Sequence, residues 1–273
     1  MTFLAATLKR PPATPCIGVC ELAGNGFCVG CARTGEEISR WSSMSEAERW
    51  RLIYEVLPLR KPVREGIDSA ALFLRLRRAL HALSAPPTGP GLNHAELADL
   101  LPAQSQLVPA AVLVGLIDYG DRQTILLTRR TDHLAHHAGQ ISFPGGRMET
   151  SDTGPVNAAL REVLEEVGVG AEWIEPIGFL DPFETISNYR VLPLVARLRP
   201  GFTLALQHNE VAEAFELPLT HFLDPARAGR RDIEYRGRLR SIHEFDCDGR
   251  RVWGATATML INLRDRLEAC VDV

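Results

Sequence analysis

The segment REVLEEVG, residues 161–168, places three glutamates and one arginine in an otherwise apolar stretch of the chain. On a helix, Glu162, Glu165 and Glu166 stand at positions i, i+3 and i+4, so their side chains share one face and repel one another. A divalent cation would relieve this repulsion more effectively than Arg161 alone. The segment therefore predicts a cation site on a helix or, as for most runs of charge, a solvated helix face.

The flanking residues predict where this helix begins and ends. Pro155 suits the first helical turn, because its missing N–H would have no partner there, and Gly168 favours the left-handed conformation that ends many helices. The glycine pair Gly145–Gly146 and a polar loop with Glu149 and Asp152 precede the helix. The glycine pair, the loop and the acidic helix therefore form one unit.

Apolar runs on both sides of this unit predict a sheet of buried strands. The expected strands are residues 110–120, 124–130, 173–183, 190–198, 232–237 and 240–246, and a last helix is expected from about Thr256 to Glu268. Prolines interrupt the two middle strands, which suggests sheet edges or bulges there.

The charge and the hydropathy pattern exclude two classes of partner. The chain has 273 residues and a formal net charge of −4, which gives no overall attraction to nucleic acid or to anionic membranes. No apolar run approaches the roughly 18 residues of a membrane span. The early stretch FLAATL is too short for the core of a signal peptide and has its basic residues on the wrong side. We expect a cytoplasmic chain.

The unit formed by the glycine pair, the polar loop and the acidic helix resembles the Nudix box. Its second half matches without a gap at Arg161, Glu162, Val163, Glu165, Glu166, Gly168 and Val169. The first half departs, because Arg161 comes one residue late when counted from Gly146. The role of the first glutamate of the box then falls to Asp152, with Glu149 as a supporting residue.

This resemblance implies an α/β/α sandwich with a mixed sheet and a divalent-metal-dependent hydrolysis of a diphosphate linkage. The residues expected to hold Mg²⁺ or Mn²⁺ are Glu162 and Glu166, and Glu165 is a second ligand or a group that orients water. Arg161 is expected to fix a glutamate by ion pairing.

Such sites normally include a further carboxylate from a distant loop. The segment HNEVAEAFELPL offers Glu210 and Glu213. We expect Glu210 to be the general base or an extra metal ligand. The alternative is that both glutamates only decorate a surface element.

Residues 127–146 resemble the signature that accompanies the box in the coenzyme A pyrophosphatase branch of this family. The matching residues are Leu127, Thr128, Arg130, Gly139, Phe143, Pro144, Gly145 and Gly146. Thr131 stands where serine or alanine is expected, and Ala135 stands where the signature has an arginine that could contact a phosphate. The stretch VWGATA at residues 252–257 is also similar to that branch.

The resemblance covers roughly residues 105–265 and implies hydrolysis of CoA or acyl-CoA to 3′,5′-ADP and a 4′-phosphopantetheine product. It implies substrate contacts by Arg130, Gly139, Phe143, Gly145 and Gly146. Two alternatives stay open. One, which the departure at Ala135 favours, is a Nudix hydrolase of another nucleoside diphosphate derivative, such as ADP-ribose or NADH. The other is a non-catalytic regulator that senses a nucleotide.

The N-terminal region predicts a second and unrelated site. Cys16 and Cys20 form one pair and Cys28 and Cys31 another, and the glycines between the pairs allow a turn that brings four thiolates together. In a cytosolic chain this pattern favours a metal over disulfides. Zinc is our first expectation, because so small a module needs a staple, and an iron–sulfur cluster is the alternative.

Together with RTGEEISRWSSMSEAER, these cysteines resemble the cysteine-rich family named Domain of Unknown Function 1289, over about residues 13–60. The resemblance brings no activity with it. We expect a metal-stapled helical module at residues 1–62, a helix and linker at 63–104, and the hydrolase domain at 105–273. The linker SAPPTGPG at residues 84–91 predicts separable halves, with an active fragment beginning near Leu92. The sequence leaves open whether the chain forms a homodimer.

Overall fold

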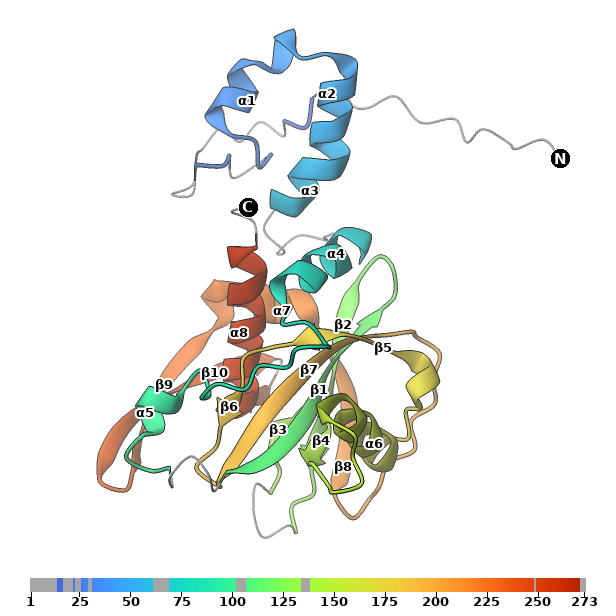
Figure 1. Cartoon of the computed structure of the whole chain (residues 1–273). Coiled ribbons are helices and arrows are strands. Elements are labelled where there is room, and N and C mark those ends of the chain that lie inside the picture. Colours follow the sequence, from blue (N-terminus) through green and yellow to red (C-terminus); the bar gives the residue numbers. More distant parts are fainter. Residues whose placement is uncertain are drawn as a thin grey trace, which may run out of the picture. The chain divides into compact units, whose positions relative to one another are not determined.

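The computed structural model describes residues 14–16, 22, 26–28, 31–60, 69–101, 107–133, 138–247 and 249–270 (Figure 1). The chain divides into two compact units, Met1–Pro62 and Val63–Val273. Cys20, a predicted metal ligand, and Ala135, where the signature departs, lie outside the described residues.

The first unit is a small helical module. It contains α1 (Gly35–Ser39), a 3-10 turn (Trp41–Ser43), α2 (Glu46–Arg51), a π-helical turn (Leu52–Val56) and α3 (Leu57–Arg60). Ser45 and Glu48 form a capping box at the start of α2, because each side chain accepts a hydrogen bond from the backbone N–H of the other residue. Thr34 and Glu37 form a second box at α1. The buried core is small and consists of Ala32, Leu52 and Leu57.

The second unit is built on a mixed sheet of eight strands. They are β1 (Val108–Asp118), β2 (Gln123–Arg130), β3 (Ile141–Ser142), β4 (Gly145–Arg147), β5 (Ile174–Phe179), β6 (Phe183–Glu184), β7 (Tyr189–Leu198) and β8 (Val211–Pro218). The main order is β3-β2-β1-β7-β5, with β4 paired to β1, β6 to β7 and β8 to β2. β1 and β7 run parallel, whereas the other pairs of this sheet are antiparallel.

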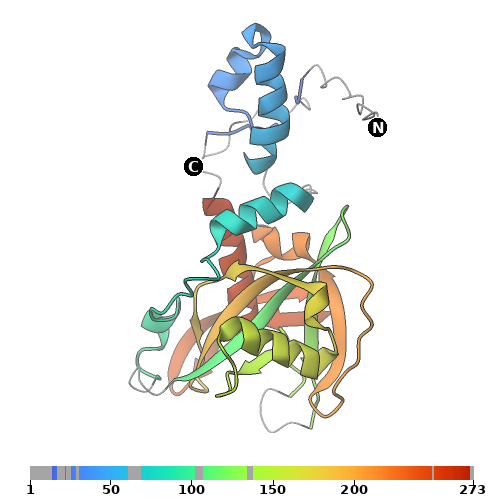
Figure 2. The same ribbon diagram turned by 45° about the vertical axis from the view of Figure 1, so that its right-hand side comes forward.

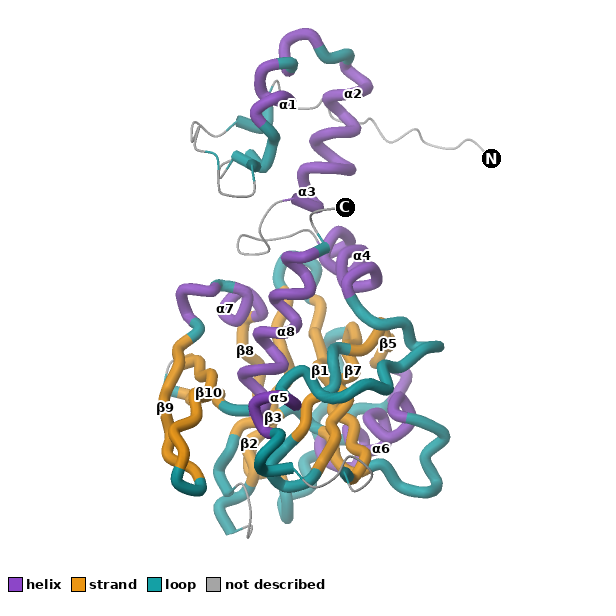
Figure 3. The backbone as a smooth tube through the Cα atoms, turned by 60° about the vertical axis from the view of Figure 1, so that its left-hand side comes forward, coloured by secondary structure: helices purple, strands orange, loops and turns teal. Residues whose placement is uncertain are grey.

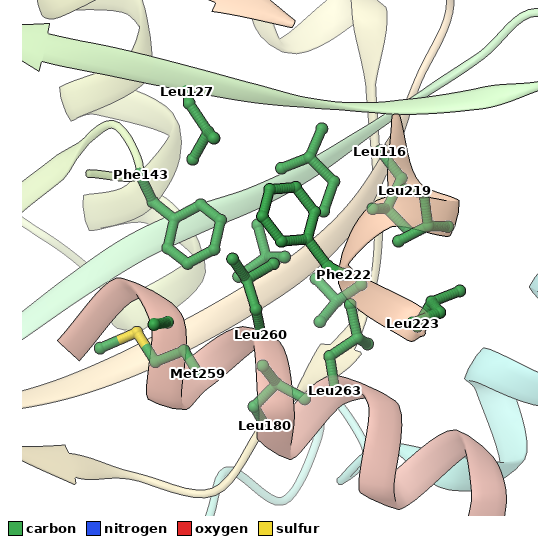
Figure 4. Close-up of a cluster of buried hydrophobic side chains, with 14 of the residues drawn as sticks. Leu116, Leu127, Phe143, Leu180, Leu219, Phe222, Leu223, Met259, Leu260 and Leu263 are labelled. Atoms are coloured by element: carbon green, nitrogen blue, oxygen red, sulfur yellow. The ribbon is translucent and has the colours of Figure 1, made fainter. Parts of the chain in front are cut away.

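Helices cover both faces of this sheet, which confirms the expected α/β/α arrangement (Figures 1 and 2). One face packs against α6 (Pro155–Val167). The other packs against α4 (Ser69–Ala79), α7 (Leu219–Leu223) and α8 (Ala255–Ala269), and Phe222, Leu260 and Leu263 gather there (Figure 4). A three-stranded sheet of β9 (Gly229–Tyr235), β10 (Arg238–Cys247) and β11 (Arg250–Trp253) lies beside α8 (Figure 3).

Prolines were expected to mark edges or bulges in the strands that are now β5 and β7. Only the proline of β5 does so. The pairing of β5 with β7 shifts register between Pro176 and Gly178, as a bulge requires. Pro193, in contrast, lies in β7 between β1 and the edge strand β5. It is tolerated there because it stands opposite the break between β5 and β6, where no ladder N–H is needed.

The helix α4 belongs to the core of the second unit, and not to a detached linker region. Leu72 and Leu76 are fully buried in the same cluster as α8. The buried guanidinium of Arg75 donates through Nη2 to the carbonyl oxygen of Leu267 at 2.6 Å. His81 and Phe179 exchange two backbone hydrogen bonds. Residues from 69 onward therefore complete the hydrophobic core.

The proline- and glycine-rich stretch that we expected to separate two halves is instead fixed to the second unit. Arg190 donates through Nη2 to the carbonyl oxygens of Pro87 and Gly89, both at 2.8 Å. The buried carboxylate of Glu184 accepts a hydrogen bond from Gly91 N at 3.0 Å and lies 2.6 Å from Nδ1 of His94 in α5 (His94–Leu97). These contacts place the stretch in the second compact unit, because tertiary contacts override its local flexibility.

Candidate functional site

The acidic helix α6 is oriented by its apolar side. Val163 and Val167 are fully buried against the sheet, which turns the neighbouring positions Glu162 and Glu166 toward the adjoining loop. Gly168 ends the helix in the left-handed conformation, with φ of 75°, and its N–H donates to Leu164 O. The start at Pro155 and the end at Gly168 agree with the sequence analysis.

The glycine pair Gly145–Gly146 on β4 lies against the carboxylates of Glu166 and Glu162. Gly145 N donates to Oε2 of Glu166 at 3.2 Å. A Cβ atom on Gly146 would lie 2.6 Å from the carboxylate of Glu162, so a larger residue would displace that carboxylate. Gly145 has φ of 149°, and a Cβ atom there would lie 2.5 Å from Ala111 O in the neighbouring strand. Only glycine fits both positions without a shift of the carboxylate or of the sheet.

Burial dominates the electrostatics of these carboxylates. Glu166 is 7% exposed, and burial raises its pKa to about 7, against a weaker lowering by the hydrogen bond from Gly145. Burial also raises the pKa of Glu162. Glu162 and Glu166 each feel the negative charge of Glu210. The site therefore gathers negative charge that a bound cation would stabilise.

Arg161 is the ion-pairing centre of this cluster. Its Nε and Nη2 donate to the two carboxylate oxygens of Asp152 at 3.1 and 3.0 Å, and this pairing lowers the pKa of Asp152. Its Nη1 donates to Glu162 and to Glu165, each at 3.0 Å. Asp152 also accepts a hydrogen bond from Glu149 N at 2.8 Å. The loop before α6, which is one residue longer than the Nudix box pattern, thus still places the carboxylate of Asp152 against Arg161.

Glu210 and Glu213 have different surroundings. Glu210 immediately precedes β8, its carbonyl oxygen accepts a hydrogen bond from Thr131 N, and its charge reaches Glu162 and Glu166. The carboxylate of Glu213 is engaged by both terminal nitrogens of Arg250, at 2.9 and 2.6 Å. The pairing of β2 with β8 shifts register between Arg129 and Arg130, so that Arg129 pairs with Glu213 and Arg130 with Val211.

The signature residues upstream of the box take two kinds of position. Arg130 lies near enough to Glu166 to lower its pKa, and its buried Nε has no hydrogen-bond partner among the described residues. Gly139 has φ of 69° and turns the chain beside Asp132. Phe143 is 4% exposed and packs in the core on the α8 side (Figure 4). Phe143 therefore packs in the core, and its contact with a substrate stays a prediction.

Two of the four N-terminal cysteines lie in one tight turn. Cys28 and Cys31 are 3% and 1% exposed. The turn is closed by Ala32 N donating to Cys28 O and by Cys28 N donating to Arg33 O, both at 2.8 Å. Cys16 is half-buried. The sequence analysis missed Arg33, whose Nε donates to Sγ of Cys31 at 3.3 Å, and its closeness to Cys31 in sequence was the only signal.

The chain regions that the structure describes contain no group of three or more His, Cys, Asp and Glu side chains already arranged to hold a metal ion. The atoms that could bind a metal nevertheless differ between α6 and the N-terminal cysteines. The glutamates of α6 offer hard oxygen donors, which suit Mg²⁺ or Mn²⁺, and the N-terminal cysteines offer soft sulfur donors. Within the same described regions, no helix has the length and apolar character needed to cross a membrane.

Comparisons with known proteins connect both units to families. A model of the NUDIX domain matches residues 107–236, and a model of DUF1289, a protein family of unknown function, matches residues 14–61. Two relatives carry the name "Uncharacterized Nudix hydrolase NudL", one from Yersinia pestis (strain Pestoides F) and one from Yersinia pseudotuberculosis serotype O:1b (strain IP 31758). Each is 36% identical over 158 residues, which cover 58% of this chain and 79% of the relative.

Solved structures also resemble the chain. One is a binary complex of the Ap4A hydrolase of C. elegans, with 20% sequence identity and a TM-score of 0.36. The match covers 40% of this chain and 80% of that chain.

Proposed function

This chain belongs to the Nudix hydrolase family, and we propose that its substrate is coenzyme A or an acyl-CoA. The products are 3′,5′-ADP and 4′-phosphopantetheine or its acylated form. Family membership makes the protein a pyrophosphohydrolase that depends on a divalent metal, which leaves the nucleotide-sensing regulator without support. The choice of CoA over ADP-ribose or NADH is the proposal.

The main support for this proposal is that residues of the upstream signature contact or influence a glutamate of the acidic helix. Arg130 and Gly145 both belong to the stretch that resembles the CoA signature, and both act on Glu166. Arg130 does so through its charge and Gly145 through its N–H. We propose that the guanidinium of Arg130 binds a phosphate oxygen beside the metal. Its buried Nε has no hydrogen-bond partner among the described residues.

The glutamates of α6 are the residues that would hold Mg²⁺ or Mn²⁺. Glu162 and Glu166, one helical turn apart, are the proposed ligands, and Glu165 adds a ligand or orients water. When bound, the metal neutralises the diphosphate and lowers the pKa of a coordinated water. Arg161 keeps Glu162 and Glu165 in place through the hydrogen bonds from its Nη1. Asp152 holds the other side of that guanidinium.

Glu210 is the proposed general base. It takes a proton from the attacking water, whose oxygen bonds to one phosphorus while the second phosphate departs with the bridging oxygen. Glu213 is less suited to this role, because its carboxylate is already bound by Arg250.

We expect Glu210→Gln to lower kcat by about 100- to 1,000-fold with little change in KM, because general-base catalysis typically contributes 10²–10⁴. Glu213→Gln is the matched control. It removes a half-exposed ion pair with Arg250 and should leave kcat within about twofold of the wild-type value. Steady-state kinetics of both variants check this assignment, and the reverse pattern would transfer the base to Glu213.

The pH dependence of stability provides a test of the metal site that needs no substrate. Because burial raises the pKa of Glu166 from 4.5 to about 7, its contribution to the stability of the metal-free protein is complete below pH 4.5 and is lost as the pH rises through 7. Mg²⁺ binds the ionised carboxylate, so it should raise the melting temperature more at pH 8 than at pH 6. Calorimetry with and without Mg²⁺ measures this difference.

Glu166→Gln is the control for this experiment, because it cannot ionise at that position. The variant should lose most of the difference between the Mg²⁺ effects at pH 8 and pH 6. Equal Mg²⁺ effects at both pH values in the wild-type protein would contradict the assignment of Glu166 as a buried ligand.

The N-terminal cysteines are the second part of the proposal. Cys16, Cys20, Cys28 and Cys31 would hold zinc or, as the alternative, an iron–sulfur cluster. The residues fit such a group at Cys28 and Cys31, because both side chains are buried and two residues separate them in the sequence. A metal bound by these thiolates would stabilise the fold of this unit, whose hydrophobic core is small.

Product analysis tests the substrate. The purified protein would be incubated with Mg²⁺ and separately with CoA, an acyl-CoA, ADP-ribose and NADH, and the products would be separated by chromatography. Formation of 3′,5′-ADP at the highest kcat/KM from CoA or acyl-CoA supports the proposal. A higher kcat/KM for ADP-ribose or NADH would show that the departure at Ala135 has changed the specificity.

A further inference from the structure

The side chain of Arg33 is buried in the first unit with an unusual set of partners. The residue is 3% exposed. Its Nε donates to Sγ of Cys31 at 3.3 Å, and its guanidinium lies over the ring of Trp41, 4.6 Å from the ring centre. Within the described residues, no carboxylate forms an ion pair with it. The sulfur atom and the aromatic ring are therefore its principal contacts.

These contacts do not balance a buried charge if the sulfur belongs to a neutral thiol. A guanidinium keeps its proton in proteins, and a buried charge needs a partner of opposite sign. The thiol group is only a weak hydrogen-bond acceptor. A ring face contributes about 0.5 to 2 kcal/mol, which is less than the several kcal/mol that burial of an ion costs. The balance is restored if the sulfur of Cys31 is anionic.

A metal-bound thiolate supplies this negative charge. Four thiolates around Zn²⁺ carry a net charge of about −2, which a small apolar module can bury only with a counter-charge. The turn from Cys28 to Arg33 places the guanidinium directly on one of the proposed ligands.

We infer that Arg33 is the counter-charge of a thiolate metal centre at Cys28 and Cys31, and that it stabilises the metal-bound form through its hydrogen bond to the sulfur of Cys31. This inference rests on the proposed N-terminal metal site. It makes Arg33 a positioning residue, which acts through Cys31 and does not bind the metal itself.

Two other arginines of this unit form ion pairs with glutamates. Arg60 pairs with Glu37 at 2.5 Å. Arg40 pairs with Glu36 at 3.4 Å, and its side chain is 58% exposed. Arg40 is therefore a matched control, because its replacement removes the same charge from the same unit without touching a cysteine.

The test compares the full-length wild-type chain with Arg33→Gln, Arg33→Lys and Arg40→Gln. Zinc is measured in each purified protein, and its affinity is determined by competition with a chromophoric chelator. Each protein is then loaded with Co²⁺, whose sulfur-to-metal charge-transfer band reports the electron density on the thiolates. Circular dichroism of the metal-loaded proteins shows whether each variant is folded.

We expect Arg33→Gln to bind zinc about 10- to 100-fold more weakly, as is typical when a group that supports a metal ligand is lost. Its cobalt charge-transfer band should move to longer wavelength, because the sulfur of Cys31 loses a cationic donor. Arg33→Lys retains the charge and should recover part of the affinity. Arg40→Gln should match the wild-type protein in both measurements.

Two results would overturn the inference, and they have different meanings. If the wild-type chain binds neither zinc nor cobalt at the cysteines, the proposed metal site fails and the inference fails with it. If the wild-type chain binds zinc and a folded Arg33→Gln binds it equally well with an unshifted cobalt band, the metal site stands and Arg33 has only a packing role. A band that shifts equally in Arg33→Gln and Arg33→Lys also contradicts the role of the charge.

Discussion

Replacement of Glu166 by glutamine is expected to lower kcat about 1,000-fold, which corresponds to about 4 kcal/mol of transition-state stabilisation. The amide keeps the size of the side chain but removes the charge that a divalent ion requires. Kinetics with saturating Mg²⁺ and the preferred substrate measure the loss. Turnover near the wild-type value would remove Glu166 from the set of metal ligands.

The same substitution should not unfold the protein. Because burial disfavours the charged form of Glu166, the neutral amide relieves that penalty, and the metal-free variant should melt no lower than the wild-type protein at pH 8. The control is Glu234→Gln, on an exposed position of β9, which should change neither kcat nor the melting temperature. Loss of turnover together with loss of folding would point to a structural role for Glu166.

A shortened chain that begins near Leu92 is expected not to fold. It lacks α4, whose Leu72 and Leu76 are completely buried, and removal of each such side chain costs about 2 to 5 kcal/mol. It also lacks Arg75, which bonds to Leu267 O. Together these losses approach the roughly 5 to 15 kcal/mol of total stability of a typical domain.

The matched control is a shortened chain that begins at Val63, where the second compact unit begins. This fragment retains α4 and the stretch fixed by Arg190 and Glu184, so it should show a cooperative thermal transition. Circular dichroism and calorimetry of the two fragments make the comparison. A folded and active fragment from Leu92 would show that α4 is dispensable and that the separation first expected from the sequence was correct.

Local signals predicted the parts of the structure that depend on local interactions. Pro155 and Gly168 set the ends of α6, and the spacing of Glu162 and Glu166 placed both carboxylates on one face. The capping box of Ser45 and Glu48 is equally local, because its partners are three residues apart. Caps and helix faces are decided within one or two turns.

The sequence could not predict features that depend on distant contacts. The stretch of residues 84–91 has the composition of a flexible linker, yet Arg190, about 100 positions away in sequence, holds it through carbonyl oxygens. Nothing in the local pattern marks such a partner. The different surroundings of Glu210 and Glu213 likewise depend on a distant residue, Arg250, which binds the carboxylate of Glu213.

The hydrogen bond from Arg75 to Leu267 joins residues that are 192 positions apart in the chain. During translation, which adds about 5 to 20 residues per second, α4 leaves the ribosome roughly 10 to 40 s before the segment that covers it has been made. Leu72 and Leu76 have no native partners from α8 during this interval. The nascent chain therefore presents an apolar helix for which molecular chaperones can compete, and the core on this face of the sheet closes only after α8 has emerged.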